Sequence, residues 1–483
     1  TADDGTGIVH TAPSHGRDDY YTGLRYDLPV PNTVNERGVL TEETGEFAGT
    51  FYKACDTVVV DRLREVGALL DVRDYKHSYP HAERDEKPVI FRATEQWFVG
   101  LEANDLRRRA LEAIEEVEWI PAAGQSRIEA MVGNRPDWCV SRQRPWGVGI
   151  PILYTAKGRK PVMDPAAVEA IAAMVERDGS DGWFLREPHE FLPEGYSYEG
   201  ETEFTKETDV LDVWFDSGST SQIVLRDAIY PEWQGERFPA DLYLEGSDQH
   251  RGWFNSSLLI GVAATGEAPF KQVLTHGFVV DEQGRKMSKR LGNVVDPVEA
   301  SEKVGADIVR YWVASVDYQG DAPCSMKILE QVGGLYRDVR NTLRFLLGNL
   351  AGYRADAELL PFDQWIVEET ERLSAEVAAA YTEYRFTDAI VAVHTFCRER
   401  LSKFYLDAIK DRMYCDGLDW PSRQSGARAC AEIARRLILL LAPITAHTAE
   451  EAWSKLGELT GEDLGSVHMA TFLLPDEARQ LEL

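Results

Sequence analysis

The chain has 483 residues and a mass of 54.3 kDa, a length that predicts about three domains of roughly 150 residues each. Hydrophobic residues make up 44% and aromatic residues 10%, ordinary globular values that exclude disordered and collagen-like classes. No run of 18 apolar residues occurs, so we expect no membrane-spanning segment. The six cysteines are scattered without a Cys-x-x-Cys pair, which excludes a disulfide scaffold and a cysteine zinc site and predicts a cytoplasmic location.

The formal net charge is −29, because 81 acidic residues oppose only 52 basic ones. Taken alone, this charge disfavours a nucleic-acid partner, since phosphate binding needs a basic face. Net charge, however, governs solubility and the long-range field and does not describe local patches. The charge therefore leaves the partner open.

The first quarter of the chain is predicted to be a β-rich module with some helix. Short β-like runs at 7–10, 57–60 and 89–92 are separated by Gly, Pro and Asn turns. An amphipathic helix is expected at 101–116.

The middle of the chain alternates strands and helices, and its end is helical. We expect strands at 211–215, 240–244 and 273–280 and a helix from about residue 297. This alternation is typical of an open α/β sheet, and such sheets bind ligands beyond the carboxyl ends of their strands. Beyond residue 305, helical periodicity predicts an all-α bundle, with helices at 336–350, 363–384, 387–405 and 426–441.

Two lysines, Lys286 and Lys289, follow an expected strand and a turn that contains Gly284. On a mobile loop they would stabilise the charge that develops on a triphosphate as pyrophosphate leaves. The alternative is a solvated basic turn.

A second cluster lies where the strand at 240–244 ends. Glu245 is suited to hold an ammonium group, and Asp248 with Gln249 a ribose, while Gly246 permits close approach of backbone to ligand. The alternative is a polar strand-to-helix turn capped by Ser247 or Asp248.

The N-terminal segment places His10, His15, Asp18 and Asp19 within ten positions. His and carboxylate side chains are metal ligands, and a polar loop is the competing interpretation.

These motifs resemble those of a known family. The string from Gly284 to Asn293 resembles the KMSKS signature of class I aminoacyl-tRNA synthetases, with Arg290 in place of the final serine. The resemblance assigns Lys289 to the ATP phosphates. The string that begins at Leu242 and contains Glu245 to Trp253 resembles the isoleucyl members of this family, which implies that Glu245 contacts isoleucyl-adenylate. The resemblance also implies that Trp253 and Trp214 form walls of the amino-acid pocket. Core packing is the alternative for both tryptophans.

Further strings extend the resemblance. Residues 134–147 resemble the return from an inserted editing domain, which implies that Arg142 and Arg144 meet acceptor-stem phosphates. The N-terminal string resembles the end of an editing site, in which His10 would contact the tRNA end or water and Asp19 the substrate's α-ammonium group. In the bundle, the resemblance implies that Lys410 and Arg412 contact tRNA phosphates. Three arginines on one helical face form either a strip that contacts the tRNA backbone or a solvated face: Arg337, Arg340 and Arg344. His447 and Trp453 are expected to pack inside the bundle.

The resemblance implies an α/β synthetase fold divided into an editing part (1–125), a catalytic half (126–300) and a stem-contact and anticodon bundle (301–483). It implies that ATP and Mg²⁺ bind as a substrate complex and that isoleucine and tRNA(Ile) are the partners. We expect no association with a membrane, no zinc ligands in this chain, and a monomer. No His-x-Gly-His motif occurs, so we expect an internal portion of a longer enzyme that is inactive alone. The alternatives are a valyl enzyme and an inactive tRNA-binding paralogue.

Overall fold

The computed structural model describes residues 6–82, 86–226 and 237–474. The chain divides into two compact units, one formed by Thr1–Asn104 with Pro136–Asp216 and the other by Asp105–Arg135 with Ser217–Leu483. Within the described part of the chain, no helix is long and apolar enough to cross a membrane.

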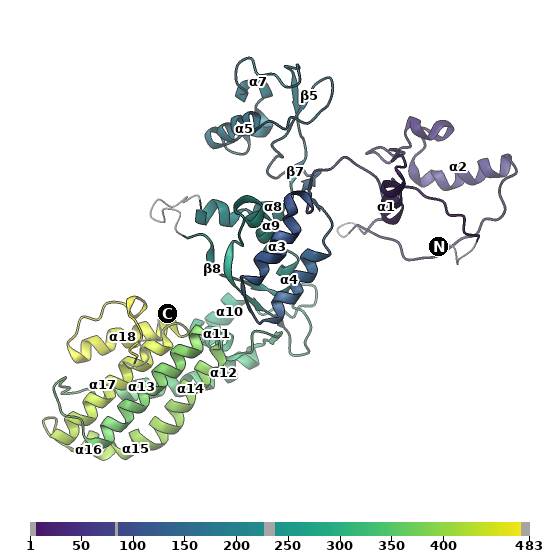
Figure 1. The fold of residues 1–483 in the computed structure, drawn as a ribbon. Helices are drawn as coiled ribbons and strands as arrows, with labels where there is room; N and C mark the ends of the chain where they lie inside the picture. The colour runs from purple at the N-terminus through teal and green to yellow at the C-terminus, as the bar shows by residue number, and fades with distance from the viewer. Residues whose placement is uncertain (1–5, 83–85, 227–236, 475–483) are drawn as a thin grey trace. The chain divides into compact units, whose positions relative to one another are not determined.

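The first unit is built from short elements (Figure 1). Three two-stranded antiparallel pairs occur, β1 with β3, β4 with β7 and β5 with β6. The elements are α1 (Arg17–Tyr26), η1 (Glu42–Phe47), α2 (Tyr52–Glu65), β1 (Phe98–Val99), β3 (Trp138–Cys139), β4 (Ser141–Arg142), β5 (Leu153–Thr155), α5 (Pro165–Asp178), α6 (Gly182–Leu185), α7 (Pro188–Phe191), β6 (Phe204–Lys206) and β7 (Val210–Leu211). A small core under α5 contains Ile171, Met174 and Trp183.

The β-like runs predicted near the N-terminus are wrong. Residues 57–60 lie inside the 14-residue helix α2, because local helical hydrogen bonding overrides the weak strand preference of β-branched residues. Residues 7–10 and 89–92 form no strand, since neither run has a neighbouring strand to pair with among the described residues, and Ile8 stays 88% exposed. The region therefore contributes helices and isolated bridges.

The second unit contains a three-stranded parallel sheet in the order β2 (Glu118–Ile120), β9 (Phe270–His276), β8 (Ala240–Gly246). The helices α3 (Leu106–Glu115), α4 (Ala123–Gly133) and α9 (Trp253–Thr265) belong to the same part of the unit. The helix expected at 101–116 and the strand expected at 240–244 are confirmed as α3 and β8.

Two predicted strands are shorter than expected. The run at 211–215 stops after β7, because Asp212 Oδ1 accepts the Trp214 N–H at 3.0 Å and α8 (Val213–Gly218) begins there. The run at 273–280 breaks at Gly277, where a Cβ would lie 2.2 Å from the Gly320 carbonyl oxygen. The chain then resumes as β10 (Val279–Val280), which pairs in parallel with β11 (Ala322–Pro323), a strand that the sequence did not indicate.

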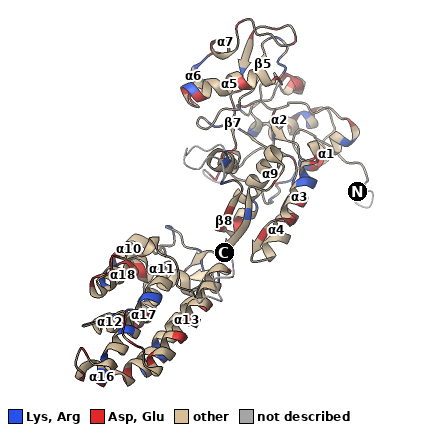
Figure 2. Ribbon diagram, turned by 60° about the vertical axis from the view of Figure 1, so that its left-hand side comes forward, with Lys and Arg blue, Asp and Glu red and all other residues tan. Residues whose placement is uncertain are grey.

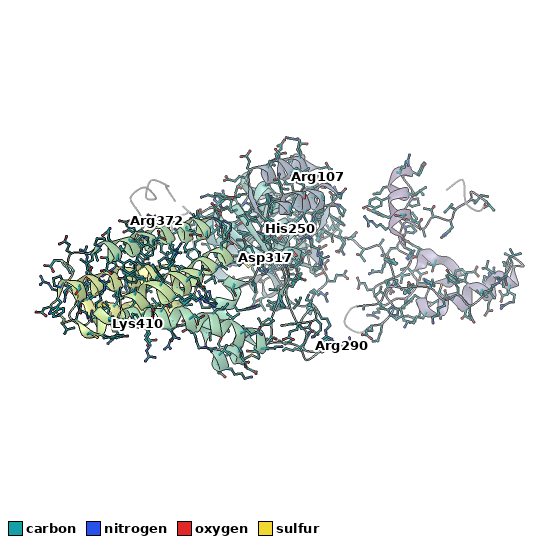
Figure 3. The ribbon with its side chains drawn as sticks, turned by 90° about the horizontal axis from the view of Figure 1, so that it is seen from below. Arg107, His250, Arg290, Asp317, Arg372 and Lys410 are labelled. Carbon is teal, nitrogen blue, oxygen red and sulfur yellow. The ribbon has the colours of Figure 1, made fainter. Side chains whose placement is uncertain are left out.

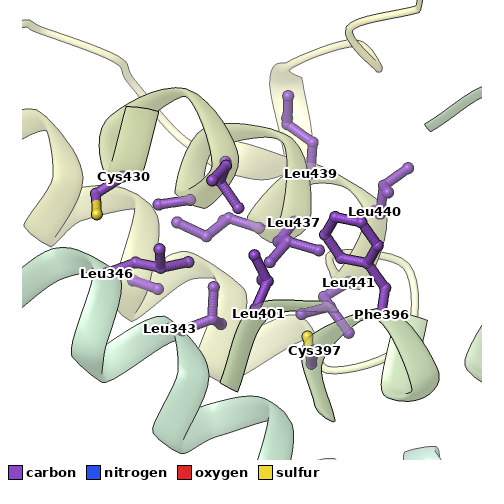
Figure 4. Close-up of a cluster of buried hydrophobic side chains, with 14 of the residues drawn as sticks. Leu343, Leu346, Phe396, Cys397, Leu401, Cys430, Leu437, Leu439, Leu440 and Leu441 are labelled. Atoms are coloured by element: carbon purple, nitrogen blue, oxygen red, sulfur yellow. The ribbon is translucent and has the colours of Figure 1, made fainter. Parts of the chain in front are cut away.

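The predicted helical bundle is confirmed (Figure 1). Its core gathers leucines and two buried thiols from several helices (Figure 4), and residues of both charge signs occur along its helices (Figure 2). Residues 396–405 differ from expectation, since they form a π-helix. The elements are α10 (Pro297–Val304), α11 (Ala306–Ser315), α12 (Met326–Gly348), α13 (Pro361–Thr382), α14 (Phe386–Thr395), η6 (Phe396–Tyr405), α15 (Leu406–Ala408), α16 (Lys410–Cys415), α17 (Pro421–Leu441) and α18 (Ala446–Thr460).

Candidate active site

The strand-end cluster lies at the carboxyl edge of the parallel sheet. In the register of β8 and β9, Glu245 is paired with Thr275 and Gly246 with His276, so both strands end at one level. The Glu245 Oε2 accepts the Gly246 N–H at 2.6 Å and lies 4.0 Å from His276 Nε2. Its side chain is half exposed, which leaves a carboxylate available to a cationic group such as an ammonium ion.

The turn after β8 is closely packed. A Cβ on Gly246 would lie 2.9 Å from Asp248 Oδ1, so the absence of a side chain permits this turn. The Gln249 Oε1 accepts the Trp253 N–H at 2.9 Å and thereby helps to begin α9, while its Nε2 lies 3.4 Å from Asp248 Oδ2. The Asp248 carboxylate and the Gln249 amide thus lie together at the strand end.

Trp253 packs rather than projecting freely. Its ring stacks on Tyr243 with centroids 4.1 Å apart and an interplanar angle of 12°. Its Nε1 donates to the Ser217 carbonyl at 3.1 Å. Trp214 lies in α8 and is 40% exposed.

The loop that carries the KMSKS-like string, residues 281–293, is called the signature loop below. A polar network centred on Asp281, which is buried, holds this loop. Asp281 Oδ1 accepts the backbone N–H groups of Gln283 at 3.0 Å and Arg285 at 2.8 Å. Its Oδ2 accepts Arg285 Nε at 2.8 Å and Asn293 Nδ2 at 2.9 Å. These donors hold the pKa of the Asp281 carboxyl well below its usual range, with the Asn293 hydrogen bond as the largest cause.

The loop cations differ in what they contact. Arg285 is paired with Asp281, and Lys286 Nζ lies 5.2 Å from the centroid of the Phe278 ring. Lys289 and Arg290 are exposed and form no ion pair within the described chain. Figure 3 shows Arg290 at the outer edge of this part of the molecule. The arrangement therefore leaves Lys286 and Lys289 free to bind an anion.

Sequence reasoning missed His250, a buried residue in η5 (Ser247–His250). His250 is labelled in Figure 3. Its Nδ1 lies 3.0 Å from the Ser247 carbonyl, its ring stacks near Trp119, and burial lowers its pKa. Sequence reasoning also missed Asp281 and Asn293. An aspartate three residues before Gly284 was the available signal, since this spacing favours a side-chain-capped turn.

The two editing candidates differ in their exposure. His10 is exposed, and Asp19 is half buried in the first turn of α1. It is His15 that forms contacts, with the Phe91 carbonyl at 2.9 Å and with Thr33. The part of the chain that the structure describes holds no group of three or more His, Cys, Asp or Glu residues placed to bind a metal ion.

Several arginines expected at tRNA phosphates have structural partners. Arg142 pairs with the buried Asp212 and donates to the Cys139 carbonyl at 2.9 Å. Arg412 pairs with the buried Asp363. Cys139 itself is half buried.

Other basic residues of the bundle stay at its surface. Lys410 forms an exposed pair with Asp407 at 2.6 Å. Arg340, Arg344 and Lys455 line a groove of about 450 Å³ between α12 and α18. Trp453 is buried as expected, whereas His447 is exposed and contributes its backbone N–H to Asp307.

The comparisons with known proteins agree with this fold. Residues 32–325 match the family described as tRNA synthetases class I (I, L, M and V), and residues 363–483 match the anticodon-binding domain of tRNA ligase. This chain therefore belongs to the class I tRNA synthetase family. The methionyl-tRNA synthetase of Mycobacterium tuberculosis, solved with methionyl-adenylate, shares the fold at a TM-score of 0.54 and 19% identity over 77% of this chain and 65% of that one.

Among curated relatives, the match is to isoleucine–tRNA ligases. The ligase of Carboxydothermus hydrogenoformans is 49% identical over 461 residues, which are 94% of this chain and 49% of the relative. That of Syntrophotalea carbinolica is 48% identical over 481 residues, which are 98% of this chain and 51% of the relative. The chain thus spans about half the length of the curated relatives it matches.

Proposed function

We propose that this chain supplies the adenylate-binding strand end, the signature loop and the anticodon-binding bundle of an isoleucine–tRNA ligase. The observation that carries the proposal is the shared edge of β8 and β9, where Glu245, Asp248 and Gln249 meet the strand that leads into the signature loop. Ligands of open α/β sheets bind at this edge. The names of the relatives, at close to half identity over nearly all of the chain, support isoleucine as the amino acid.

The proposed reaction is attack of the isoleucine carboxylate oxygen on the α-phosphorus of ATP. A new oxygen–phosphorus bond forms as the bond to the bridging oxygen breaks, and pyrophosphate leaves with the electron pair. Lys286 and Lys289 stabilise the charge that builds on pyrophosphate. Glu245 holds the α-ammonium group, and Asp248 with Gln249 holds the ribose. Mg²⁺ accompanies ATP as part of the substrate.

In the second step the activated isoleucine passes to tRNA(Ile), bound by the bundle. We assign residues 1–125 to editing, 126–300 to catalysis and 301–483 to stem and anticodon contacts. The groove lined by Arg340, Arg344 and Lys455, with Glu451 as its one acidic lining residue, supports tRNA contact in a chain whose net charge is acidic. The free thiols of all six cysteines agree with a cytoplasmic location, and we propose that the enzyme acts as a monomer.

Hydrolytic editing of valine is part of the same proposal. One methylene distinguishes the two amino acids and is worth only about 1–3 kcal/mol in an apolar pocket. We assign His10 to the tRNA end or water and Asp19 to the α-ammonium group of the mischarged amino acid. The position of Asp19 in the first turn of α1 fixes that carboxylate on a helix.

The test is ATP–pyrophosphate exchange by a hybrid in which this chain replaces the matching half of the Carboxydothermus relative. Lys289→Ala is expected to lower exchange at least about a hundredfold, as loss of a charged transition-state contact does. Lys271→Ala is the matched control, because Lys271 lies near the opposite end of β9 and pairs with Asp241. Equal exchange by the two variants would contradict the assigned role of the signature loop.

A further inference from the structure

The signature loop is an excursion from β10 that returns to its own starting point. Asp281 lies directly after β10, and Asn293 lies twelve residues further on. The Asn293 Nδ2 donates to Asp281 Oδ2 at 2.9 Å, which closes the loop at its base. The two side chains therefore join the first and last residues of the excursion.

The same two side chains also fix the backbone within the loop. The two Asp281 oxygens accept four hydrogen bonds, two from backbone N–H groups of the turn and two from side chains. Asn293 Oδ1 accepts the Ser288 N–H at 2.9 Å, between the two lysines of the signature. In every one of these hydrogen bonds, a donor therefore faces an acceptor.

A second, apolar anchor lies between the lysines. Met287 packs against the buried cluster that contains Ala300, Trp312 and Leu329. Because Met287 points into this cluster and Arg285 is engaged by Asp281, the neighbouring Lys286 and Lys289 are left at the surface. The loop conformation thus selects which cations face the solvent.

We propose that Asp281 and Asn293 are positioning residues for the signature lysines: their side-chain pair holds the loop in the conformation from which Lys286 and Lys289 reach the leaving pyrophosphate. This inference rests on the proposed function for its catalytic consequence, and on geometry alone for its structural one. Neither residue touches the substrate in this account.

The structural test is residue-resolved hydrogen exchange of this chain, which needs no catalysis. In Asp281→Asn, the new amide NH₂ faces the N–H groups of Arg285 and Asn293, which are also donors. The hydrogen bond between positions 281 and 293 is therefore lost, and the Asn293 side chain is no longer held. The Ser288 amide is then expected to exchange at least about tenfold faster, corresponding to a loss of about 1.4 kcal/mol of local protection. Asn293→Asp opposes two carboxylates and is expected to do the same.

A double variant distinguishes a specific interaction between residues 281 and 293 from a general loss of loop structure. The Asp281→Asn/Asn293→Asp double variant restores one carboxylate and one amide in reversed order and leaves only Arg285 Nε without its acceptor; because the new carboxylate at position 293 still accepts the Ser288 N–H, Ser288 protection is expected to return. Arg290→Ser is the matched control, since Arg290 lies in the loop outside the pair, and it should leave Ser288 exchange unchanged. If Asp281→Asn does not fold, Asn293→Ala is measured against the same control.

The catalytic test uses the hybrid enzyme. Asp281→Asn is expected to lower the kcat of exchange at least about tenfold with the KM for isoleucine unchanged, because isoleucine is held at the strand end. The double variant should recover kcat. Unaltered Ser288 exchange in both single variants, or no recovery in the double variant, overturns the positioning role. An inactive parent hybrid would instead contradict the proposed function and leave the hydrogen-exchange result standing on its own.

Discussion

At the scale of single residues, the bundle is organised around a buried carboxylate. Asp363 is fully buried and accepts hydrogen bonds from Tyr405 Oη at 2.6 Å and Arg412 Nη1 at 2.8 Å, and from Ser425 Oγ. Burial raises the pKa of the Tyr405 phenol, which stays protonated and serves as a donor. The network joins α13, η6, α16 and α17.

Removal of this carboxylate is predicted to destabilise the bundle strongly. Asp363→Ala leaves a half-buried guanidinium and two hydroxyl groups without their acceptor, a change that costs about 3–5 kcal/mol. Denaturant unfolding of this chain measures the effect. Lys410→Ala is the control, because it removes only the exposed pair with Asp407 and should cost less than about 1 kcal/mol. Similar losses in both variants would show that the Asp363 network is not what stabilises the bundle.

His250 makes stability depend on pH. Burial lowers its pKa in the folded chain, so the unfolded chain, with an ordinary histidine pKa of about 6.5, takes up the proton first as pH falls. Its contribution to stability is complete above about pH 6.5 and decreases below that value. The slope is at most about 1.4 kcal/mol per pH unit, and it ends below the pKa of the folded state.

The measurement is the free energy of unfolding from pH 8 to 5 for the native chain and for His250→Gln. The native chain is expected to lose stability more steeply below about pH 6.5, and the difference between the curves isolates His250 from the other histidines. Parallel curves would contradict a neutral, buried His250.

At the scale of elements, α11 holds the corner between α17 and α18. Asp307 accepts the N–H groups of His447 at 3.2 Å and Thr448 at 2.7 Å, at the beginning of α18. Arg310 donates to the carbonyls of Ile444 at 2.7 Å and Pro443 at 2.8 Å, just after α17 ends. A carboxylate thus meets a helix N-terminus, and a guanidinium meets carbonyl groups that follow a C-terminus, the arrangement that helix dipoles favour.

Loss of this cap is predicted to weaken the bundle measurably. Asp307→Ala should cost about 1–2 kcal/mol, the usual effect of removing an N-terminal helix cap. The midpoint of denaturant unfolding checks this value, with Asp411→Ala, an exposed carboxylate on α16, as control. A midpoint shift no larger than that of the control would contradict the role of α11.

The sequence was informative about elements wherever periodicity extended over many residues. The helices of the bundle were predictable because each buries a regular stripe, and strand β8 because its apolar run ends in small and polar residues. The break at Gly277 was not, because it depends on the backbone of Gly320, more than forty residues away. The helical state of residues 57–60 was missed because four β-branched or apolar residues do not reveal the 14-residue helix around them.

The site was predictable in part for a similar reason. The chemistry of Glu245, Asp248 and the signature lysines is visible in their residue types and order. Which arginines are already paired is not visible, since Arg142 and Arg412 meet their carboxylates, Asp212 and Asp363, across 70 and 49 residues. The same limit hid the Asp281 and Asn293 pair.

At the scale of the whole molecule, the proposed function places anionic substrates on an acidic chain. The net charge of −29 coexists with a loop whose lysines are exposed and with a groove whose lining includes Arg340, Arg344, Lys455 and Glu451. Under this proposal, local geometry outweighs the total charge in deciding what the protein binds.

The most direct test of the central claim is amino-acid-dependent ATP–pyrophosphate exchange by the hybrid enzyme, with isoleucine, valine and leucine in parallel. We predict exchange with isoleucine, a lower kcat/KM for valine by about 10- to 200-fold, and a loss of isoleucine exchange in Glu245→Ala. Preference for valine would contradict the assignment of isoleucine. Absence of exchange with all three, in a hybrid that folds, would contradict the assignment of a catalytic role to this chain.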